Sequence, residues 1–589
     1  MFLRPNHRHK DGKAHVYWSL VETVRTPDGP RQRTLCYLGE LNHSAEARWL
    51  KSIEVFNEQG ESRQLKLFPS EVEPPENDAE VVRVLVRKVR LERVREFGPC
   101  FLGWELWRRL QLDRLWEEQL DGEEAEVPWS RVAAVLAINR LCAPASELGI
   151  EERWYPATAL EELLRIPAGT INHTRLYRCL DRLIPHKVHV ERHLKQRYGE
   201  LFAAEFDVLL YDLTSSYVEG EAGKNPMMHR GYSRDHRPDC KQVVIALIVN
   251  GEGFPLSYET LDGDRSDVTT LEVLMRMVER KYGKARRVWV FDRGVVSEAN
   301  LAALRRRGGQ YLVGTPRSKL KEFEQALLEG DWKQIQEEVE VKLVSLPDTT
   351  ETYVLCRSSS RREKEKAIRH RFSQRLEQAL GRLHQRIVHG RLKDPTKIQQ
   401  ALARLRVSYS RVADLYQMSL VEREGTLQLE WQQREERLAW RETREGAYLL
   451  RTNLSGESAE ELWKKYIQLT EAAFRVLKSA LWIRPLFHQL ERRIKAHILV
   501  AFLGYALWVT LKHLLHRKDS GWSPAQALAL LSTLHSADIV LPTTDGREIR
   551  LRRVSAPDPK QQQLLDQLGL TVPQDLELNF ECSVDSALA

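Results

Sequence analysis

Two aspartates in the middle of the chain directly follow short apolar runs. Asp212 follows residues 206–211, and Asp292 follows residues 288–291. Both runs have the length and composition of buried strands, and the residues after each aspartate suit a loop. Open α/β sheets place functional groups at strand ends, where a carboxylate reaches solvent while its strand stays buried. Two such aspartates on neighbouring strands could share a hard cation such as Mg²⁺, which prefers oxygen ligands.

A third carboxylate, Glu471, lies in a segment with helical spacing, residues 464–481. Glu471, Arg475 and Lys478 are spaced i, i+4 and i+7, so they share one face of a helix. The same spacing also describes an exposed ion pair, worth only about 0.2–0.5 kcal/mol. On spacing alone the ion pair is the simpler explanation for Glu471, and each aspartate, taken singly, is more simply a solvated strand end. Spacing therefore identifies three candidate carboxylates but, by itself, favours a surface role for each.

Composition sets broad limits on the class of protein. The 589 residues include 90 Lys and Arg against 83 Asp and Glu, a net charge of +7 that suits a polyanionic partner and many soluble enzymes alike. Seven scattered cysteines without a CxxC pair indicate neither a zinc site nor a disulfide framework, and a reducing cytoplasm fits. The longest apolar run, residues 498–511, is too short to span a bilayer and predicts a buried core helix.

The elements that must position these carboxylates follow from patterning along the chain. Apolar alternation, helical spacing and polar linkers divide it into six regions. They are 1–80 (β-rich, with a linker), 81–204 (helical, a candidate DNA-binding domain), 205–317 (first part of an α/β core), 318–445 (an inserted module), 446–515 (second part of the core, with the Glu471 helix) and 516–589 (a C-terminal tail region).

A basic run inside the inserted module, at 357–371, includes Arg361, Arg362 and Lys364. Such a run could supply salt-sensitive contacts to DNA phosphates. A solvated helix face or loop explains it equally well. Two tryptophans of the same module, Trp431 and Trp440, could stack on a displaced base, although core packing is the simpler expectation.

Four linear motifs occur in order along the chain. They are 211–220 (YDLTSSYVEG), 231–243 (GYSRDHRPDCKQV), 290–294 (VFDRG) and 471–488, which includes EAAFRVLKS and RPLFH. In this order they resemble the motifs of bacterial insertion-sequence DDE transposases, in one large branch of the IS-four superfamily. The resemblance extends from the first residues into the C-terminal region. One departure is that Lys464 and Ile467 replace the Tyr and Arg found seven and four residues before the glutamate.

The resemblance implies an α/β fold with an RNase H-like core, interrupted by a mostly β insertion between the second Asp and the Glu, and preceded by β-rich and helical DNA-binding regions. It also implies that Asp212, Asp292 and Glu471 hold two Mg²⁺ ions, with Mn²⁺ as a substitute. Lys478 then matches a basic residue that contacts DNA phosphate near the cut. Arg475 would provide a further contact with the DNA backbone.

The implied function is that of a DNA transposase, which binds the terminal inverted repeats of an insertion sequence and catalyses metal-dependent strand cleavage and strand transfer. Its partners would be double-stranded DNA, as element ends and target, and a second copy of the chain, since two ends must meet. A bacterial cytoplasmic, nucleoid-associated location without a membrane would follow. The alternatives are an RNase H-like nuclease, a domesticated DNA-binding protein without transposition, and a two-carboxylate glycosidase, for which the sequence supplies no sugar-binding aromatic cleft.

Overall fold

A computed structural model describes most of the chain from residue 83 onward, together with five N-terminal strands. The described residues are 2–10, 13–26, 29–40, 52–56, 62–66, 83–122, 125–221, 223, 225–232, 237–265, 269–283, 287–291, 294, 296–346, 349–423, 426–476, 483–544, 546–573 and 576. Asp292 and Lys478 therefore lie outside the described residues, and for Asp212, Glu471 and Arg475 only the backbone is described.

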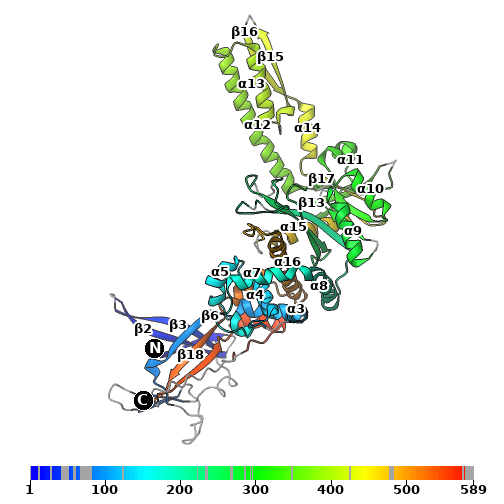
Figure 1. The fold of residues 1–589 in the computed structure, drawn as a ribbon. Helices are drawn as coiled ribbons and strands as arrows, with labels where there is room; N and C mark the ends of the chain where they lie inside the picture. Colours follow the sequence, from blue (N-terminus) through cyan, green and yellow to red (C-terminus); the bar gives the residue numbers. More distant parts are fainter. Residues whose placement is uncertain are drawn as a thin grey trace.

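The N-terminal region is built from antiparallel strands, as its apolar alternation predicts. Strands β1 (Phe2–Lys10), β2 (Lys13–Thr26) and β3 (Gly29–Glu40) form a three-stranded sheet in sequence order. Strands β4 (Ser52–Phe56) and β5 (Ser62–Lys66) pair with each other. The three-stranded sheet lies at the lower end of the molecule in Figure 1.

Helices follow, and they surround one long apolar helix from the C-terminal part of the chain. The surrounding helices are α2 (Gly98–Arg109), α3 (Leu112–Leu120), α4 (Trp129–Cys142), α5 (Glu147–Gly149), α6 (Leu160–Leu163), α7 (His173–Leu183) and α8 (Lys187–Phe202). The long helix, α16 (Glu491–Arg517), packs against α2, α4, α7 and α8. By length and composition α16 could cross a membrane, but most of its apolar stretch is buried inside the fold. The predicted core helix at 498–511 is thus confirmed.

The centre of the molecule is a nine-stranded mixed sheet. Its order is β12-β13-β14-β17-β11-β10-β7-β8-β9. The strands are β7 (Val208–Tyr217), β8 (Gln242–Asn250), β9 (Pro255–Leu261), β10 (Val288–Phe291), β11 (Gln310–Gly314), β12 (Lys333–Gln336), β13 (Val339–Ser345), β14 (Thr352–Ser358) and β17 (Ala447–Thr452). Strands β7, β10 and β11 run parallel, and the other neighbours pair antiparallel.

Helices cover both faces of this sheet, so the chain has a mixed α/β fold with a large central sheet. Helices α9 (Leu271–Tyr282) and α10 (Glu298–Arg306) pack on the face that carries Leu209, Tyr211 and Phe291. The opposite face carries Leu210, Val290 and Leu312, which share a core with α15 (Ala459–Arg475) and the helical layer. Since successive strand residues alternate between faces, each strand contributes to two separate cores.

The expectation of a mostly β insertion at 318–445 is wrong. Strands β13 and β14 join the central sheet, and the rest is dominated by α12 (Ser359–Val388), α13 (Pro395–Ser408) and α14 (Glu435–Arg444), with β15 (Tyr416–Arg423) and β16 (Thr426–Gln433) as a hairpin. The physical reason is the recurrence of Leu376, Leu380, Leu383 and Ile387 at helical spacing, which makes α12 amphipathic. This helical module, residues 359–445, projects away from the central sheet in Figure 1.

The C-terminal region returns to the beginning of the helical layer. It contains α17 (Pro524–Leu531), β18 (His535–Pro542), β19 (Glu548–Val554) and α18 (Pro559–Leu568). Strand β18 lies between β19 and β6 (Arg90–Glu96), forming a three-stranded antiparallel sheet. Close packing accompanies the pairing, because a Cβ at Gly98 would lie 2.1 Å from the Leu531 carbonyl oxygen.

Candidate active site

The two predicted strands that precede the aspartates are neighbours in the sheet. Strands β7 and β10 pair in parallel, with Tyr211 opposite Phe291. Asp212 is the next residue of β7, and Asp292 is the next residue of the sequence after Phe291. The prediction of two adjacent buried strands is confirmed, and the residues before the two aspartates are in register.

Strand β7 does not end at Asp212, contrary to the sequence-based expectation of a loop there. It continues to Tyr217, because residues 213–216 pair antiparallel with β8. Thr214, Ser215 and Ser216 are almost completely buried. Small hydroxyl side chains resemble a loop in sequence, yet here they continue a strand that is paired with β8.

Helix α15, which carries Glu471, packs on the central sheet. It packs against β7, β10 and β11, and its residues Leu462 and Trp463 belong to the buried core. Trp463 Nε1 donates a hydrogen bond of 2.6 Å to Tyr448 Oη on β17. Residue 471 lies in the last turns of this helix. The backbone thus places the elements that carry Asp212 and Glu471 in contact.

The segment after α15 is fastened to the end of β7. Ser216 Oγ donates to the Ile483 carbonyl oxygen (2.9 Å), the Leu486 N–H donates to the Tyr217 carbonyl oxygen (2.8 Å), and the Glu219 N–H donates to the Leu486 carbonyl oxygen (2.9 Å). This segment contains the RPLFH motif. The sequence showed the motif but not its structural role, which is to hold the chain beyond Glu471 against the Asp212 strand.

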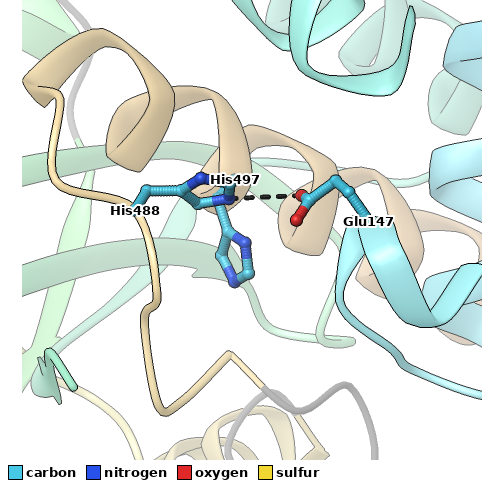
Figure 2. Close-up of side chains that lie close together, drawn as sticks. All are labelled: Glu147, His488 and His497. Atoms are coloured by element: carbon cyan, nitrogen blue, oxygen red, sulfur yellow. Dashed lines mark hydrogen bonds and ion pairs between the residues drawn. The ribbon is translucent and has the colours of Figure 1, made fainter. Parts of the chain in front are cut away.

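A buried polar cluster continues from this segment into the helical layer (Figure 2). His488 Nε2 lies 3.2 Å from Glu147 Oε1 on α5, and His497 on α16 completes the group, with all three ligand atoms within 4.8 Å of one another. Arg140 Nη2 lies 3.2 Å from His497 Nδ1. Burial, reinforced by Arg140 and His488, holds the pKa of His497 well below its usual value.

The distances in this cluster would permit a metal ion, but its charges disfavour one. The Arg140 guanidinium is already within hydrogen-bonding distance of His497 Nδ1, and its positive charge would repel a divalent cation. Burial acts to raise the pKa of Glu147, yet the hydrogen bond from His488 and the nearby charges lower it overall, so Glu147 is an anion between polar partners. We therefore describe the cluster as a buried joint between the helical layer and residues 483–497. Sequence reasoning missed it because Glu147 and Arg140 are more than 300 positions away from the two histidines.

Some side chains of the basic run at 357–371 are paired with glutamates, and others are exposed. Arg361 Nε donates to Glu365 Oε1 (3.1 Å), and its guanidinium lies over the Tyr448 ring, 5.2 Å from the centroid. Arg369 is buried and paired with Glu445 at 2.6 Å. Arg362 and Lys364 are exposed. Part of the run therefore fixes the base of the helical module.

The two tryptophans of the module pack against different cores, Trp431 within the module and Trp440 at its base. Trp431 is half-buried against the core between α12, α13 and the β15–β16 hairpin, with the His384 ring 6.0 Å away. Trp440 is half-buried against a second small core, and Arg444 lies 5.0 Å from its ring centroid. Core packing, the simpler of the two expectations, describes both.

Comparisons with known proteins place the chain among transposases. The N-terminal domain model of the IS1634 family transposases matches residues 3–62, and the transposase DDE domain model matches residues 204–507. A search of curated proteins found no match.

Three solved structures show distant similarity. A piggyBac transposase synaptic complex with hairpin DNA has 9% identity over 76% of this chain and 82% of the other, with a TM-score of 0.34. A pre-cleavage Mos1 transpososome has 11% identity over 31% of this chain and 58% of the other, with a TM-score of 0.14. A Mos1 transposase paired-end complex has 12% identity over 31% and 57%, also with a TM-score of 0.14. The assignment depends on the family models: the DDE domain match covers more than half of the chain, including β7, β10 and α15, so the chain belongs to the DDE transposases of insertion sequences.

Proposed function

We propose that this DNA transposase binds the terminal inverted repeats of its insertion sequence and cleaves and transfers their strands with Asp212, Asp292 and Glu471. The observation that carries the proposal is the parallel register of Tyr211 with Phe291, together with the packing of α15 on both strands. One carboxylate directly follows each paired residue in sequence, and the third belongs to the covering helix.

The strand order supports an RNase H-like core. Strands β9, β8 and β7 form an antiparallel meander, and β7, β10 and β11 continue it in parallel. This is the arrangement that the family resemblance implies for the core. Strands β17, β14, β13 and β12 extend the sheet beyond β11.

The residues of the site fit divalent metal ions. Three carboxylates are oxygen donors, which Mg²⁺ and Mn²⁺ prefer. Alternation along β7 assigns position 212 to the face of Leu210, which α15 covers. Thr214 Oγ1, two positions further on, is buried and has no hydrogen-bond partner among the described residues, so a polar group bound on this face would satisfy it. Two bound ions would supply activation of the attacking oxygen and stabilisation of the leaving oxygen.

Other residues of the chain would position the DNA. We place Lys478 and Arg475, which follow Glu471 by seven and four residues, near the phosphates at the cut. Arg362 and Lys364 remain candidates for further DNA contacts because both are exposed, whereas Arg361 is engaged with Glu365. A homodimer that holds two element ends, acting in the bacterial cytoplasm at the nucleoid, completes the proposal.

The test is cleavage of terminal-repeat DNA with Mg²⁺ by Asp212→Asn, Asp292→Asn and Glu471→Gln. We expect each variant to bind the DNA but to lose at least about 100-fold in cleavage rate, the scale for removing one group that stabilises transition-state charge. Asp262→Asn and Glu460→Gln, which alter carboxylates of the β9 loop and of α15 itself, serve as matched controls and should cleave normally. Full activity in any of the three site variants would refute the assignment. Joining of the cleaved end to a second duplex separates transposition from simple hydrolysis.

A further inference from the structure

Positive charge is concentrated in one part of the helical module. Residues 359–411, which contain α12 and α13, hold 15 Lys and Arg against 4 Asp and Glu, a net charge of +11. The whole chain has a net charge of only +7. The remainder of the protein is therefore slightly acidic, and any long-range attraction to a polyanion is directed toward this module.

Some of these cations have structural roles. Arg361 and Arg369 are paired with glutamates, and Arg406 donates a hydrogen bond to the Met418 carbonyl oxygen (3.3 Å). Seven other lysines and arginines on α12 are exposed, and among the described residues no carboxylate lies within 4 Å of them. Two of them, Arg362 and Lys366, lie on the far side of the helix from the other five. The five that share one side, which we call the α12 stripe, are Lys364, Arg371, Arg375, Arg382 and Arg386.

The α12 stripe is a straight line along the helix. Its members are separated by 7, 4, 7 and 4 positions. At 100° per residue this spacing keeps all five within a sector of about 60°. The apolar face of α12, with Leu376, Leu380, Leu383 and Ile387, lies about 120° away around the axis and packs on α13, β15 and β16. The stripe therefore faces away from the packed side of the module.

No negative charge interrupts this sector. The glutamates of α12 are Glu363, Glu365 and Glu377, and each lies at least about 80° from the centre of the stripe. Glu365 is engaged with Arg361, and Glu377 accepts a hydrogen bond from Tyr416 Oη (2.7 Å). The arrangement thus separates an uninterrupted row of cations from the carboxylates that fix the helix in the module.

We infer that the α12 stripe binds the backbone of double-stranded DNA that lies outside the terminal repeat. The inference rests on the DNA-transposing function proposed above and extends it to a surface of the helical module. With a rise of 1.5 Å per residue, the stripe is about 33 Å long, which is close to one turn of B-DNA. A duplex presents on the order of 20 phosphates over that length.

The side-chain types suit this ligand. Four of the five residues are arginines, whose planar guanidinium groups bind phosphate oxygens through two parallel hydrogen bonds. Contacts with phosphates carry no sequence information, so the same stripe can hold any flanking or target duplex. Such contacts release counterions from the DNA, and the affinity should fall steeply with salt.

The experiment measures binding of the full chain to a labelled duplex of about 30 bp without a terminal repeat, in EDTA, from about 50 to 200 mM KCl. The test variant combines Arg371→Gln, Arg375→Gln, Arg382→Gln and Arg386→Gln. The matched control removes four exposed cations from other elements, Arg306→Gln, Lys512→Gln, Lys518→Gln and Lys560→Gln. If all four stripe arginines contact phosphate, the slope of log affinity against log salt should become shallower by about 3.6, so the wild type loses roughly 150-fold more affinity over this range than the variant.

A third variant, with lysine at the same four stripe positions, keeps the charges and should retain most of the affinity, which excludes misfolding as the cause of a loss. An unchanged salt slope in the glutamine variant would overturn the inference, as would an equal loss in the control. EDTA prevents cleavage, so these outcomes are independent of the three carboxylates. An unchanged salt slope would therefore not contradict the proposed catalytic role of the three carboxylates. Conversely, a fully active Asp212→Asn variant would refute that catalytic role but not DNA binding by the stripe.

Discussion

At the level of single residues, the buried joint between the helical layer and residues 483–497 contains a histidine that is held neutral. His497 lies among Arg140, His488 and Glu147, and burial is the main reason that its pKa is well below the usual value. In the unfolded chain the same imidazole takes up a proton near pH 6.5. Because the unfolded state then binds more protons than the folded state, stability must fall as pH decreases through about 6.5, by up to about 1.4 kcal/mol per pH unit.

His497→Gln should remove this acid sensitivity. Between pH 7.5 and 5.5 we expect the variant to lose about 1 kcal/mol less stability than the wild type. The measurement is the midpoint of thermal unfolding at each pH. The pKa of Glu147 is lowered by its hydrogen bond with His488 and by nearby charges, so its own proton uptake lies below this window. His516→Gln, at an exposed position of the same helix, is the control, and parallel acid shifts in wild type and His497→Gln would contradict the prediction.

At the level of elements, the helical module is joined to the sheet through a tight glycine. Gly446 has φ +77°, and a Cβ there would lie 2.5 Å from the Ser358 carbonyl oxygen and 2.8 Å from Arg362 Cβ. The Gly446 N–H donates to Glu365 Oε2 (3.1 Å). Both the backbone conformation and the space therefore require glycine at the point where the module returns to β17.

Gly446→Ala should destabilise the protein more than Gly456→Ala. Gly456 has a similar φ of +84° but open space around the missing Cβ, so alanine there meets only the left-handed strain of about 1–2 kcal/mol. At Gly446 the clash should add at least about 1 kcal/mol. Thermal unfolding of the two variants measures the difference, and equal midpoints would show that the joint relaxes around a methyl group.

Local sequence patterns predicted the strands and helices whose formation depends mainly on the spacing of nearby apolar residues. The apolar runs at 206–211 and 288–291 became the adjacent strands β7 and β10, and the helical spacing around Glu471 became α15. The hydroxyl-rich residues 213–216 were misjudged as a loop, because their burial depends on pairing with β8. The mostly β insertion was an inference from family resemblance, whereas the leucine spacing of α12 already indicated a helix.

At the level of the whole molecule, a buried ion-pair network joins the C-terminal sheet to the beginning of the helical layer. Arg552 on β19 binds Asp538 on β18 through two hydrogen bonds of 2.6 and 2.9 Å. Arg552 also lies 3.1 Å from Glu162, which is paired with Arg95 on β6. Both side chains of the Asp538–Arg552 pair are almost completely buried, so loss of one charge leaves the other without compensation in a poorly hydrated place.

Asp538→Asn should therefore lower the free energy of unfolding substantially. Removing one partner of a buried pair costs about 3–5 kcal/mol, and the remaining Glu162 contact favours the lower end. Glu460→Gln, which breaks the more exposed contacts with Lys333 and Lys464, is the comparison and should change stability far less. Chemical denaturation of both variants tests this, and similar losses would mean that Arg552 finds other partners.

Local sequence patterns could not predict which strands pair when they are far apart in the sequence. Pairing of β18 with β6 joins segments more than 400 positions apart, and β14 reaches β17 across the whole helical module. Strand partners are chosen by the three-dimensional packing of entire faces, which no local window contains. The three carboxylates are a prediction from motifs, whereas no motif pointed to the cluster of Glu147, His488 and His497.

Because of the geometry at its base, the helical module could change in length without disturbing the central sheet. Arg357 and Ala447 are paired in the sheet, so the module leaves and rejoins the core at one point, and lengthening α12 and its partners would not disturb the strands. The stripe, however, repeats every 11 residues, or about three helical turns. Insertions of about 7, 11 or 18 residues would extend the reach by about 10, 16 or 27 Å and turn the charges by no more than about 20°, whereas insertions of about 5 or 9 residues would turn them by about 140° or 180°, away from the duplex. Variation in reach among relatives should therefore occur in discrete steps.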